Sequence, residues 1–454
     1  MSLSVDEHLR MPSCTPGAAP LAGRLPLTLR LRGAAGRLVR SRFSWSVAGT
    51  TAARLGQMGC QLLVSVIVSR VLGPGGRGLY ATAGVLTALG TSFGNLGLPA
   101  ANTYEVARQR RQLPELLANS VAVAALMGAL LAAALWLLGW WHPELLPDDR
   151  ALLVLALAAI PIGLGQLLLQ HLVVGLHEVR FFNAVTLVSG AVPLAGVTVL
   201  WGTGRLTTWA AFAAGVAGTA LPTLIMWWRL RARLEGRPRV SLPLLRQSVS
   251  YGLRAYLTTL AHALVLRIDI LMVRAWLGNE SVGQYSAAAA LAEWAILVPS
   301  VASMLLFPRV AAGANRREQW SLCRRAIPVY LLMMGVATTA AAVLARPAVV
   351  VLYGEAFLPA AAVFLWLLPG VFFRGASYPA YLFLGAIGRP ISQLVLCFAV
   401  VAVNVAGNAL LISRWGLNAA AAVSSGSYLL GCAGGYWLAR RHARHSFAVR
   451  EANP

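Results

Sequence analysis

A row of polar side chains follows one face of the first long apolar segment of this sequence. The row consists of Thr50, Arg54, Gln57, Gln61 and Ser65, spaced 4, 3, 4 and 4 residues apart. At the angular step of a helix these five positions lie within about 80° of arc. An arginine at the centre of a membrane helix costs about 2.5–3.5 kcal/mol even on the lenient insertion scale, so this face should line protein or water rather than lipid.

A second row of the same kind lies in the second half of the sequence. Its members are Tyr251, Arg254, Thr258, His262 and Asp269, which also fall within about 80° of one helix face. Gln57 and His262 are 205 positions apart, which is the offset of an internal repeat. We therefore expect the two rows to overlap around one water-filled cavity.

Three further apolar segments carry polar side chains at helical spacing. They are Arg374, Ser377, Tyr378 and Tyr381 in one segment, Ser286, Glu293 and Ser300 in another, and Gln166 and Gln170 in a third. A single polar residue in a membrane helix is usually a link between helices, and we assign Asn404 and Asn408 to that role. Arg267 lies about 160° around its helix from Tyr251, so we interpret it as a structural or interface residue.

These residue types predict a site for an anion with a polar, sugar-like body. Guanidinium groups bind phosphates through planar bidentate hydrogen bonds, and amides, hydroxyls and phenols suit sugar hydroxyls. The predicted substrate-binding residues are Arg54, Gln57, Gln61, Tyr251, Arg254, Thr258, His262, Arg374 and Tyr378. Asp269 and Glu293 are the candidates for coupling transport to a proton or sodium ion, and a permanent structural ion pair is the alternative for both.

The composition places these segments in a bilayer. Of the 454 residues 58% are hydrophobic and 12% are charged, against about 25% charged in an ordinary soluble domain. The formal net charge is +23 and every basic residue is arginine. The arginines concentrate in short loops between apolar runs, which the positive-inside rule explains better than binding to nucleic acid. The five cysteines are far apart and lack metal spacing, so no metal site, disulfide or cofactor is expected.

The clearest mark of an internal repeat is the segment Ser69–Tyr80, SRVLGPGGRGLY, which recurs as RAWLGNESVGQY at Arg274–Tyr285. Its residues Gly73, Gly75 and Gly78 spell G-x-G-x-x-G, the dinucleotide-binding fingerprint. That fingerprint requires a strand before it and a helix after it. Here it joins two segments of membrane length, so we predict a tight turn built from glycine and proline instead.

About twelve apolar segments of roughly twenty residues follow one another, six in each half. The predicted fold is therefore an all-α polytopic membrane protein with two six-helix lobes. Six spans per half is an even number, so both halves begin on the same side and the repeat is parallel. The predicted parts are a basic tail at 1–42, a first lobe at 43–229, a linker at 230–247, a second lobe at 248–439 and a tail at 440–454.

The distribution of arginines predicts the orientation. The tails, the linker and the loops on their side carry 27 of the 38 arginines. The opposite loops carry five, namely Arg77, Arg150, Arg205, Arg346 and Arg414. Arg70 and Arg274 flank the two repeated turns, where their side chains can extend to the interface. Both termini should therefore face the cytoplasm.

Several runs with patterned glycines and prolines resemble the bacterial oligosaccharide flippases, across roughly 43–439. They are SRVLGPGGRGLYATAGVL, NLGLPAANTYEVAR, RIDILMVRAWLGNESVGQYSAAAALAE, LVPSVASMLLFPRVA and NVAGNALLISRWGLNAAAAVS. These proteins are polysaccharide-biosynthesis membrane proteins of the O-antigen type, in the superfamily of the MATE exporters and the lipid II flippase.

The resemblance implies a bacterial inner-membrane protein that is not an enzyme. It would flip undecaprenyl-pyrophosphate-linked oligosaccharide to the periplasmic leaflet by alternating access, with membrane lipids and polysaccharide assembly proteins around it. Arg54 and Arg254 match positions where such relatives carry cavity cations. The alternatives are a MATE-like drug or metabolite exporter, a glycan polymerase, and a structural partner of a polysaccharide synthase. A polymerase needs a large periplasmic loop, whereas the longest one predicted here spans about 141–150.

Overall fold

The computed structural model describes residues 42–388 and 390–451, and it leaves undescribed the side chains of 42–47, 254, 255, 390 and 445–451. Across these ranges the regular structure is helical, without any β-strand. The chain divides into residues 1–48 and a compact unit, Gly49–Pro454. Every predicted site residue lies in this compact unit.

Twelve α-helices occur in the described ranges. In chain order they are α2 (Arg42–Gly94), α3 (Leu98–Arg108), α4 (Leu113–Trp141), α5 (Arg150–Gly175), α6 (Val179–Gly202), α7 (Thr208–Arg231), α8 (Leu242–Ala311), α9 (Arg316–Tyr353), α10 (Leu358–Ala376), α11 (Tyr378–Ala386), α12 (Pro390–Trp415) and α13 (Leu417–Glu451). Three short 3-10 turns join some of them: η1 (Arg110–Gln112), η2 (Pro143–Leu145) and η3 (Glu355–Phe357).

The two longest helices are each broken at a repeated glycine. Gly73 in α2 has φ 65° and ψ −173°, and Gly278 in α8 has φ 77° and ψ −174°. Glycine is favoured here because a positive φ strains residues that carry a Cβ. Pro74 follows the first break, and proline suits the beginning of a new helix. The predicted turn is confirmed, and the dinucleotide fingerprint lies between two helices.

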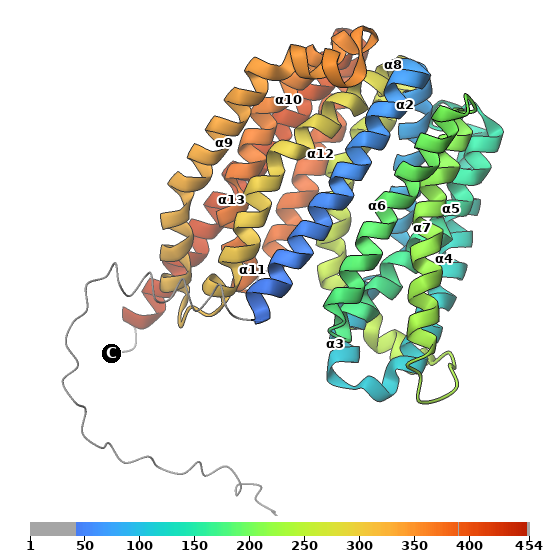
Figure 1. Ribbon diagram of the computed structural model, residues 1–454. Helices are drawn as coiled ribbons and strands as arrows, with labels where there is room; N and C mark the ends of the chain where they lie inside the picture. Colours follow the sequence, from blue (N-terminus) through green and yellow to red (C-terminus); the bar gives the residue numbers. More distant parts are fainter. Residues whose placement is uncertain (1–41, 389, 452–454) are drawn as a thin grey trace, which may run out of the picture. The chain divides into compact units, whose positions relative to one another are not determined.

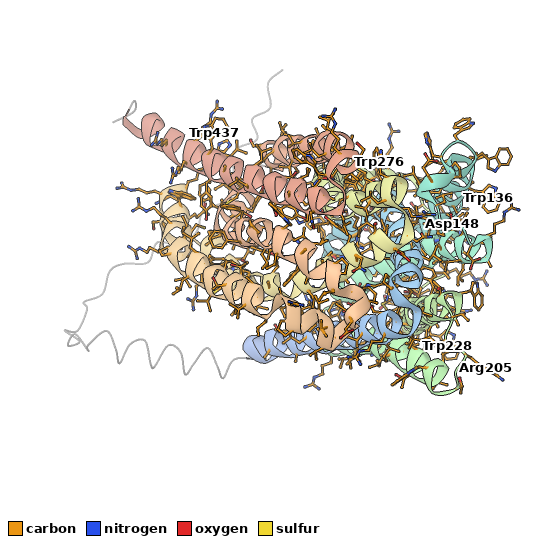
Figure 2. The ribbon with its side chains drawn as sticks, turned by 90° about the horizontal axis from the view of Figure 1, so that it is seen from above. Trp136, Asp148, Arg205, Trp228, Trp276 and Trp437 are labelled. Carbon is orange, nitrogen blue, oxygen red and sulfur yellow. The ribbon has the colours of Figure 1, made fainter. Side chains whose placement is uncertain are left out.

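The helices form a multi-pass membrane protein. Nine of the described helices are long and apolar enough to cross a membrane, and two of these, of 47 and 56 residues, are the broken helices α2 and α8. Large apolar side chains face outward, including Trp228 and Val343, each 75% exposed. Figure 2 shows Trp136, Trp228 and Trp437 at the periphery. Such an apolar exterior with outward tryptophans is typical of a surface that contacts lipid.

Each half of the compact unit contains an apolar core. Leu116, Leu172 and Leu230 pack together in the first half, where α4 contacts α5 and α6 contacts α7. Tyr353 and Phe364 belong to the core of the second half. In Figure 1 the green and cyan helices α4–α7 stand beside one another, and the orange and red helices α9, α10 and α13 do the same. The predicted all-α fold is confirmed.

Several helix ends differ from the predicted boundaries. The loop predicted between the second and third spans contains the helix α3, and α8 begins at Leu242, inside the predicted linker 230–247. Pro243 occupies the first turn of α8, where a missing backbone N–H costs nothing. The helix α13 continues to Glu451, through most of the predicted tail 440–454. The loop between the second and third spans, the linker and the C-terminal tail therefore contain more helix than the sequence suggested.

Candidate functional site

The two repeated turns touch each other backbone to backbone. A Cβ added to Gly78 would lie 1.8 Å from the carbonyl oxygen of Asn279, and one added to Gly283 would lie 1.9 Å from that of Pro74. Gly78 and Gly283 occupy equivalent positions in the repeat, so the contact is nearly symmetric. No side chain larger than hydrogen fits at either position without moving a backbone.

Arg77 corrects the sequence interpretation, because it is buried rather than part of an outer loop. Its guanidinium donates to the Ser65 carbonyl at 3.0 Å in the same half, and to the Ser286 hydroxyl and carbonyl, both at 3.1 Å, in the other half. It also lies over the Tyr353 ring, 4.8 Å from the centroid. Because Arg77 lies in a turn, the sequence analysis expected it to be exposed. The repeated turn of the other half covers its side chain instead.

Two other arginines link the halves in equivalent ways. Arg70 in the first half donates to the Leu352 carbonyl at 3.0 Å, and Arg274 in the second half donates to the Leu146 carbonyl at 3.1 Å. Arg274 also pairs with Asp148 at 2.7 Å and is buried, whereas Arg70 is exposed. We call the glycine contacts and the hydrogen bonds of Arg70, Arg77 and Arg274 the hairpin clasp.

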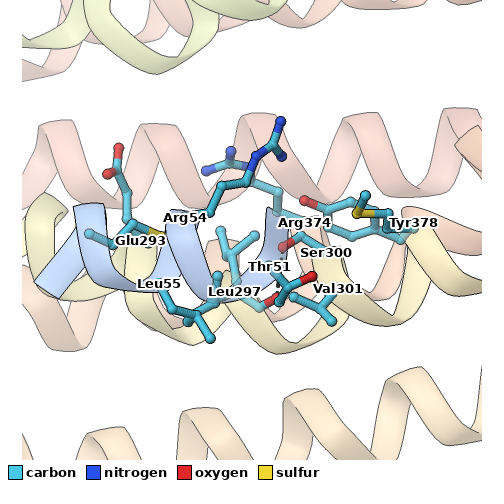
Figure 3. Close-up of a pocket in the computed structure, with 12 residues that line it drawn as sticks. Thr51, Arg54, Leu55, Glu293, Leu297, Ser300, Val301, Arg374 and Tyr378 are labelled. Atoms are coloured by element: carbon cyan, nitrogen blue, oxygen red, sulfur yellow. Dashed lines mark hydrogen bonds between the residues drawn. The ribbon is translucent and has the colours of Figure 1, made fainter. Parts of the chain in front are cut away.

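A pocket of about 360 Å³, which we call the central pocket, lies between helices of both halves. It is lined by α2 (Thr51, Arg54, Leu55, Met58), α8 (Glu293, Ile296, Leu297, Ser300, Val301, Met304), α10 (Arg374) and α11 (Tyr378). The structure thus brings together Arg54, Glu293, Ser300, Arg374 and Tyr378, which the sequence had placed in one cavity. In Figure 3 the Arg54 and Arg374 side chains reach the same side of this pocket from different helices.

The two pocket arginines lack the partners that saturate the clasp arginines. Among the side chains that the structure describes, neither the Arg54 nor the Arg374 guanidinium forms an ion pair or a hydrogen bond. Arg54 and Glu293 are exposed to the pocket, and Arg374 is half-buried with its guanidinium 5.8 Å from the Tyr428 ring centroid. Their N–H donors are therefore available to a ligand, and the pocket carries more positive than negative formal charge.

A second cavity, of about 330 Å³, adjoins the central pocket, and we call it the second-half cavity. Its lining comes from α8 (Thr258, Thr259, His262, Val265), α10 (Arg374), the α10–α11 junction (Ser377), α11 (Tyr378, Tyr381), α12 (Gln393, Cys397, Val400) and α13 (Ser427, Tyr428, Gly431, Cys432). Arg374 and Tyr378 line both cavities. The predicted residues Thr258 and His262 therefore belong to this cavity and not to the central pocket.

Three predicted binding residues lie outside both cavities, which corrects the prediction of one polar face. Gln57 donates to the Ser189 hydroxyl of α6 at 2.8 Å, and Gln61 is exposed but lines neither cavity. Tyr251 stacks on Tyr104 of α3 with centroids 4.8 Å apart. The polar face of α2 contacts α6 along one edge and lines the pocket along the other, which separates Gln57 from Arg54. The beginning of α8 packs on α3 of the first half, which separates Tyr251 from the pocket. The side chain of Arg254 lies outside the described residues.

Asp269 is buried in a separate polar cluster of the second half. It accepts hydrogen bonds from the Tyr285 hydroxyl, from Ser424 Oγ at 3.2 Å and from the Ile270 N–H at 2.8 Å. Ser424 in turn accepts from Asn404 at 3.4 Å, and Asn408 donates to Asn404 at 3.0 Å.

This cluster also changes two of the interpretations made from the sequence. The expected place of Asp269 in the cavity row is wrong, because it lines neither cavity. Asn404 links α12 to α13 through Ser424, as predicted, and so belongs to the cluster around an acid, whereas Asn408 bonds to Asn404 within α12. Among the described side chains, the buried Asn408 Oδ1 is left without a hydrogen-bond partner. The sequence analysis named Asp269, Asn404 and Asn408 but missed Tyr285, whose place at the end of the repeated segment could have drawn attention to it.

Comparisons with known proteins agree with this architecture. The model of a family described as polysaccharide biosynthesis protein matches residues 67–362. Among curated protein sequences none matches this chain.

Solved structures of transporters share the fold. An inward-facing multidrug resistance MATE transporter of the MOP superfamily is 13% identical with a TM-score of 0.71, covering 89% of this chain and 100% of that one. The lipid II flippase MurJ, in an inward closed conformation, is 12% identical with a TM-score of 0.69, covering 86% and 87%. A MOP superfamily transporter from Pyrococcus furiosus is 13% identical with a TM-score of 0.62, covering 90% and 97%.

Proposed function

We propose, from the premise that this chain belongs to the polysaccharide biosynthesis protein family, that it translocates an oligosaccharide linked to undecaprenyl pyrophosphate across the bacterial inner membrane. The observation that carries the proposal is the pair of guanidiniums of Arg54 and Arg374, which line one pocket from different halves and form no hydrogen bond or ion pair among the described residues. Each can offer a bidentate pair of donors to a phosphate. A diphosphate bound by both would connect the two halves through the ligand.

In this proposal, alternating access depends on two kinds of contact between the halves, the hairpin clasp and the bound ligand. The hairpin clasp joins the two halves at one end of the molecule, through residues that do not line the central pocket. Binding of the substrate diphosphate changes the free energy of whichever conformation brings the two pocket arginines closest. The ligand therefore shifts the equilibrium between the two conformations, and its release on the other side of the membrane returns that equilibrium to its ligand-free position.

Coupling to an ion is assigned to the Asp269 cluster. A buried carboxylate with hydroxyl and amide groups around it can take up a proton or hold a sodium ion, and either event would neutralise the charge. Glu293, which lines the central pocket, is the second candidate. Either change alters the electrostatic balance inside the second half and so the preference between conformations.

The test is transport by the purified protein in proteoliposomes. Undecaprenyl diphosphate bearing a short glycan should cross the bilayer, and an Arg54→Gln, Arg374→Gln variant should lower the rate about tenfold or more, since hydrogen bonds to charged groups contribute about 1.5–3 kcal/mol each. Lysine at either position should restore only part of the rate, because it lacks the bidentate fork. Full transport by the double glutamine variant would refute the proposal.

Drug export is the second candidate, favoured by Glu293 in the pocket and by the MATE fold. A lipophilic cation would pair with Glu293 and be repelled by the two arginines. The same vesicles distinguish the two substrates: uptake of a cationic dye that Glu293→Gln abolishes and the arginine variants increase would establish export of drugs instead.

The proposed orientation places both termini and the loop between α7 and α8 in the cytoplasm, with the hairpin clasp on the periplasmic side. A reporter active only in the cytoplasm should function at Gly236, and alkaline phosphatase should function at Asp148. Phosphatase activity at Gly236, or none at Asp148, would reverse the assignment.

A further inference from the structure

The second-half cavity shares Arg374 and Tyr378 with the central pocket, the proposed phosphate site, but differs from it in chemistry. Arg374 is the charged residue among its described lining residues, and no carboxylate lines it. Its walls combine the rings of Tyr378, Tyr381 and Tyr428 with apolar side chains such as Val265 and Val400. At about 330 Å³ it is at the small end of ligand pockets, which run roughly 300–1,000 Å³. It therefore suits one compact group and not a whole oligosaccharide.

Polar groups of this cavity are left without partners inside the protein. The hydroxyl Oγ1 of Thr258 is buried and forms no hydrogen bond among the described residues. The His262 ring, the Gln393 amide and the Tyr428 hydroxyl also line the cavity; His262 is exposed and the other two are half-buried, and none of the three forms a hydrogen bond among the described side chains. An unpartnered buried hydroxyl costs free energy, which a ligand with its own hydroxyl groups would recover.

One of the aromatic walls is anchored by a hydrogen bond, and a second lies against an arginine. The Tyr381 hydroxyl donates to the Gly431 carbonyl at 3.1 Å, across from α11 to α13. The Tyr428 ring lies beside the Arg374 guanidinium. These rings offer flat apolar faces for the C–H side of a pyranose, while the neighbouring donors and acceptors can bind its hydroxyls.

We propose that the second-half cavity is the subsite for the sugar directly attached to the diphosphate, and that Thr258, Gln393 and Tyr428 select that sugar. The proposal rests on the proposed function, since it takes Arg374 as a phosphate contact. A ligand held at Arg374 has its next group within reach of this cavity, because Arg374 lines both. A polyprenyl chain is the competing occupant, but it would leave the buried Thr258 hydroxyl without a hydrogen bond and would offer none to the polar groups beside it.

Two native cysteines report on the occupant. Cys397 and Cys432 line the cavity, whereas Cys60 lies against α6 and Cys323 is fully buried elsewhere. The protein with serine at positions 14, 60 and 323 keeps the two reporters. A small methanethiosulfonate reagent should modify both in the absence of ligand, and a matched variant that keeps only Cys60 is the control.

The probes are undecaprenyl diphosphate alone and the same lipid bearing a single sugar, as a panel of hexose, N-acetylhexosamine and deoxyhexose. At about ten times its Kd a sugar-bearing probe should slow modification of Cys397 and Cys432 about tenfold, because the free fraction falls as 1/(1 + [L]/Kd). The bare diphosphate should bind without slowing it, and Cys60 should be unaffected by any probe.

Substitutions give an independent readout. Gln393→Leu should weaken binding of the sugar-bearing probe about tenfold, as expected when a hydrogen bond to a sugar hydroxyl is lost. Binding of the bare diphosphate should stay within about twofold of the wild-type value. Gln61→Leu, on a side chain that lines neither cavity, is the matched control and should change neither Kd.

Four results would overturn the proposal. Equal protection by the bare lipid would assign the cavity to the polyprenyl chain. Unmodified cysteines in the free protein, or bound sugar probes that protect neither cysteine, would exclude a hydrated sugar subsite. If no probe binds at all, the proposed function itself fails, and that outcome is distinct because the bare diphosphate is then also unbound.

Discussion

The arginines of the hairpin clasp and those of the central pocket differ in what their guanidiniums touch. Arg70, Arg77 and Arg274 donate to carbonyl, hydroxyl or carboxylate oxygens across the two halves. Arg54 and Arg374 face a pocket and, within the described structure, have neither hydrogen bonds nor ion pairs. The same residue type therefore closes one region of the molecule and leaves another able to bind.

The difference shows how a membrane protein can use some arginines to hold its structure together and others to bind a ligand. A guanidinium removed from water must recover its lost hydrogen bonds, and the clasp arginines recover them from the protein. The pocket arginines keep access to water in the pocket and can exchange it for phosphate oxygens. The number of protein acceptors around a guanidinium thus separates a structural arginine from a binding arginine.

The strongest way to break the clasp is to add side chains where its backbones meet. Gly78→Ala places a Cβ 1.8 Å from the Asn279 carbonyl oxygen, so one of the two backbones must move. We expect a loss of about 2 kcal/mol or more in stability and a severe loss of transport, measured by thermal unfolding in detergent and by vesicle transport.

Gly75→Ala is the matched control in the same turn. A Cβ there would be 3.9 Å from its nearest neighbour, the Glu280 side chain. Its stability should stay within about 0.5 kcal/mol of the wild type. Equal stability of the two variants would contradict the close contact between the turns.

The next effect concerns coupling, which distinguishes the Asp269 cluster from both arginine regions. Asp269→Asn keeps the shape and an acceptor for Tyr285 and Ser424 but removes the charge. Coupling free energies between sites are about 1–3 kcal/mol, or about 5–150-fold, so the stimulation of transport by an imposed proton or sodium gradient should fall by a factor in that range.

Glu293→Gln is the companion variant, because Glu293 is the other candidate. Loss of the gradient response in Asp269→Asn alone identifies the cluster as the coupling site, and loss in Glu293→Gln alone identifies the pocket. Wild-type dependence on pH, sodium and potential in both variants would mean that neither carboxylate couples transport.

The smallest expected effects come from the polar links of the clasp. In a double-mutant cycle Arg274→Ala and Asp148→Ala should show a coupling of about 1 kcal/mol, because Arg274 is buried while Asp148 is largely exposed. Arg70→Ala, on an exposed side chain without a carboxylate partner in the described structure, should cost about 0.5 kcal/mol or less. A loss of stability in Arg70→Ala that exceeds the coupling energy between Arg274 and Asp148 would contradict this ranking.

The sequence was informative where the repeat and the apolar periodicity carried the signal. It predicted the break at Gly73 and Gly278, the all-α membrane fold, and a cavity that brings Arg54 and Arg374 together. Helical spacing identifies which side chains share a face, and it needs no knowledge of neighbouring helices. That is why these features could be predicted.

The neighbours of each face could not be predicted in the same way. Gln57 shares its face with Arg54, yet it bonds to Ser189 because α6 covers that edge of α2. Asp269 lies on the face of His262 but ends in a cluster with Tyr285, because the second piece of α8 folds back beside it. Arg77 became buried because two turns 205 residues apart meet, which spacing within one segment does not reveal.

The comparison between the two arginine groups is tested most directly by the affinity for undecaprenyl diphosphate, measured for matched glutamine variants in lipid nanodiscs. Arg54→Gln and Arg374→Gln should each raise the Kd about tenfold or more, since each removes charged hydrogen bonds to phosphate. Arg70→Gln, at the clasp, should change it by less than about twofold. An unchanged Kd in the two pocket variants, or an equal loss in Arg70→Gln, would contradict the assignment of the central pocket as the phosphate site.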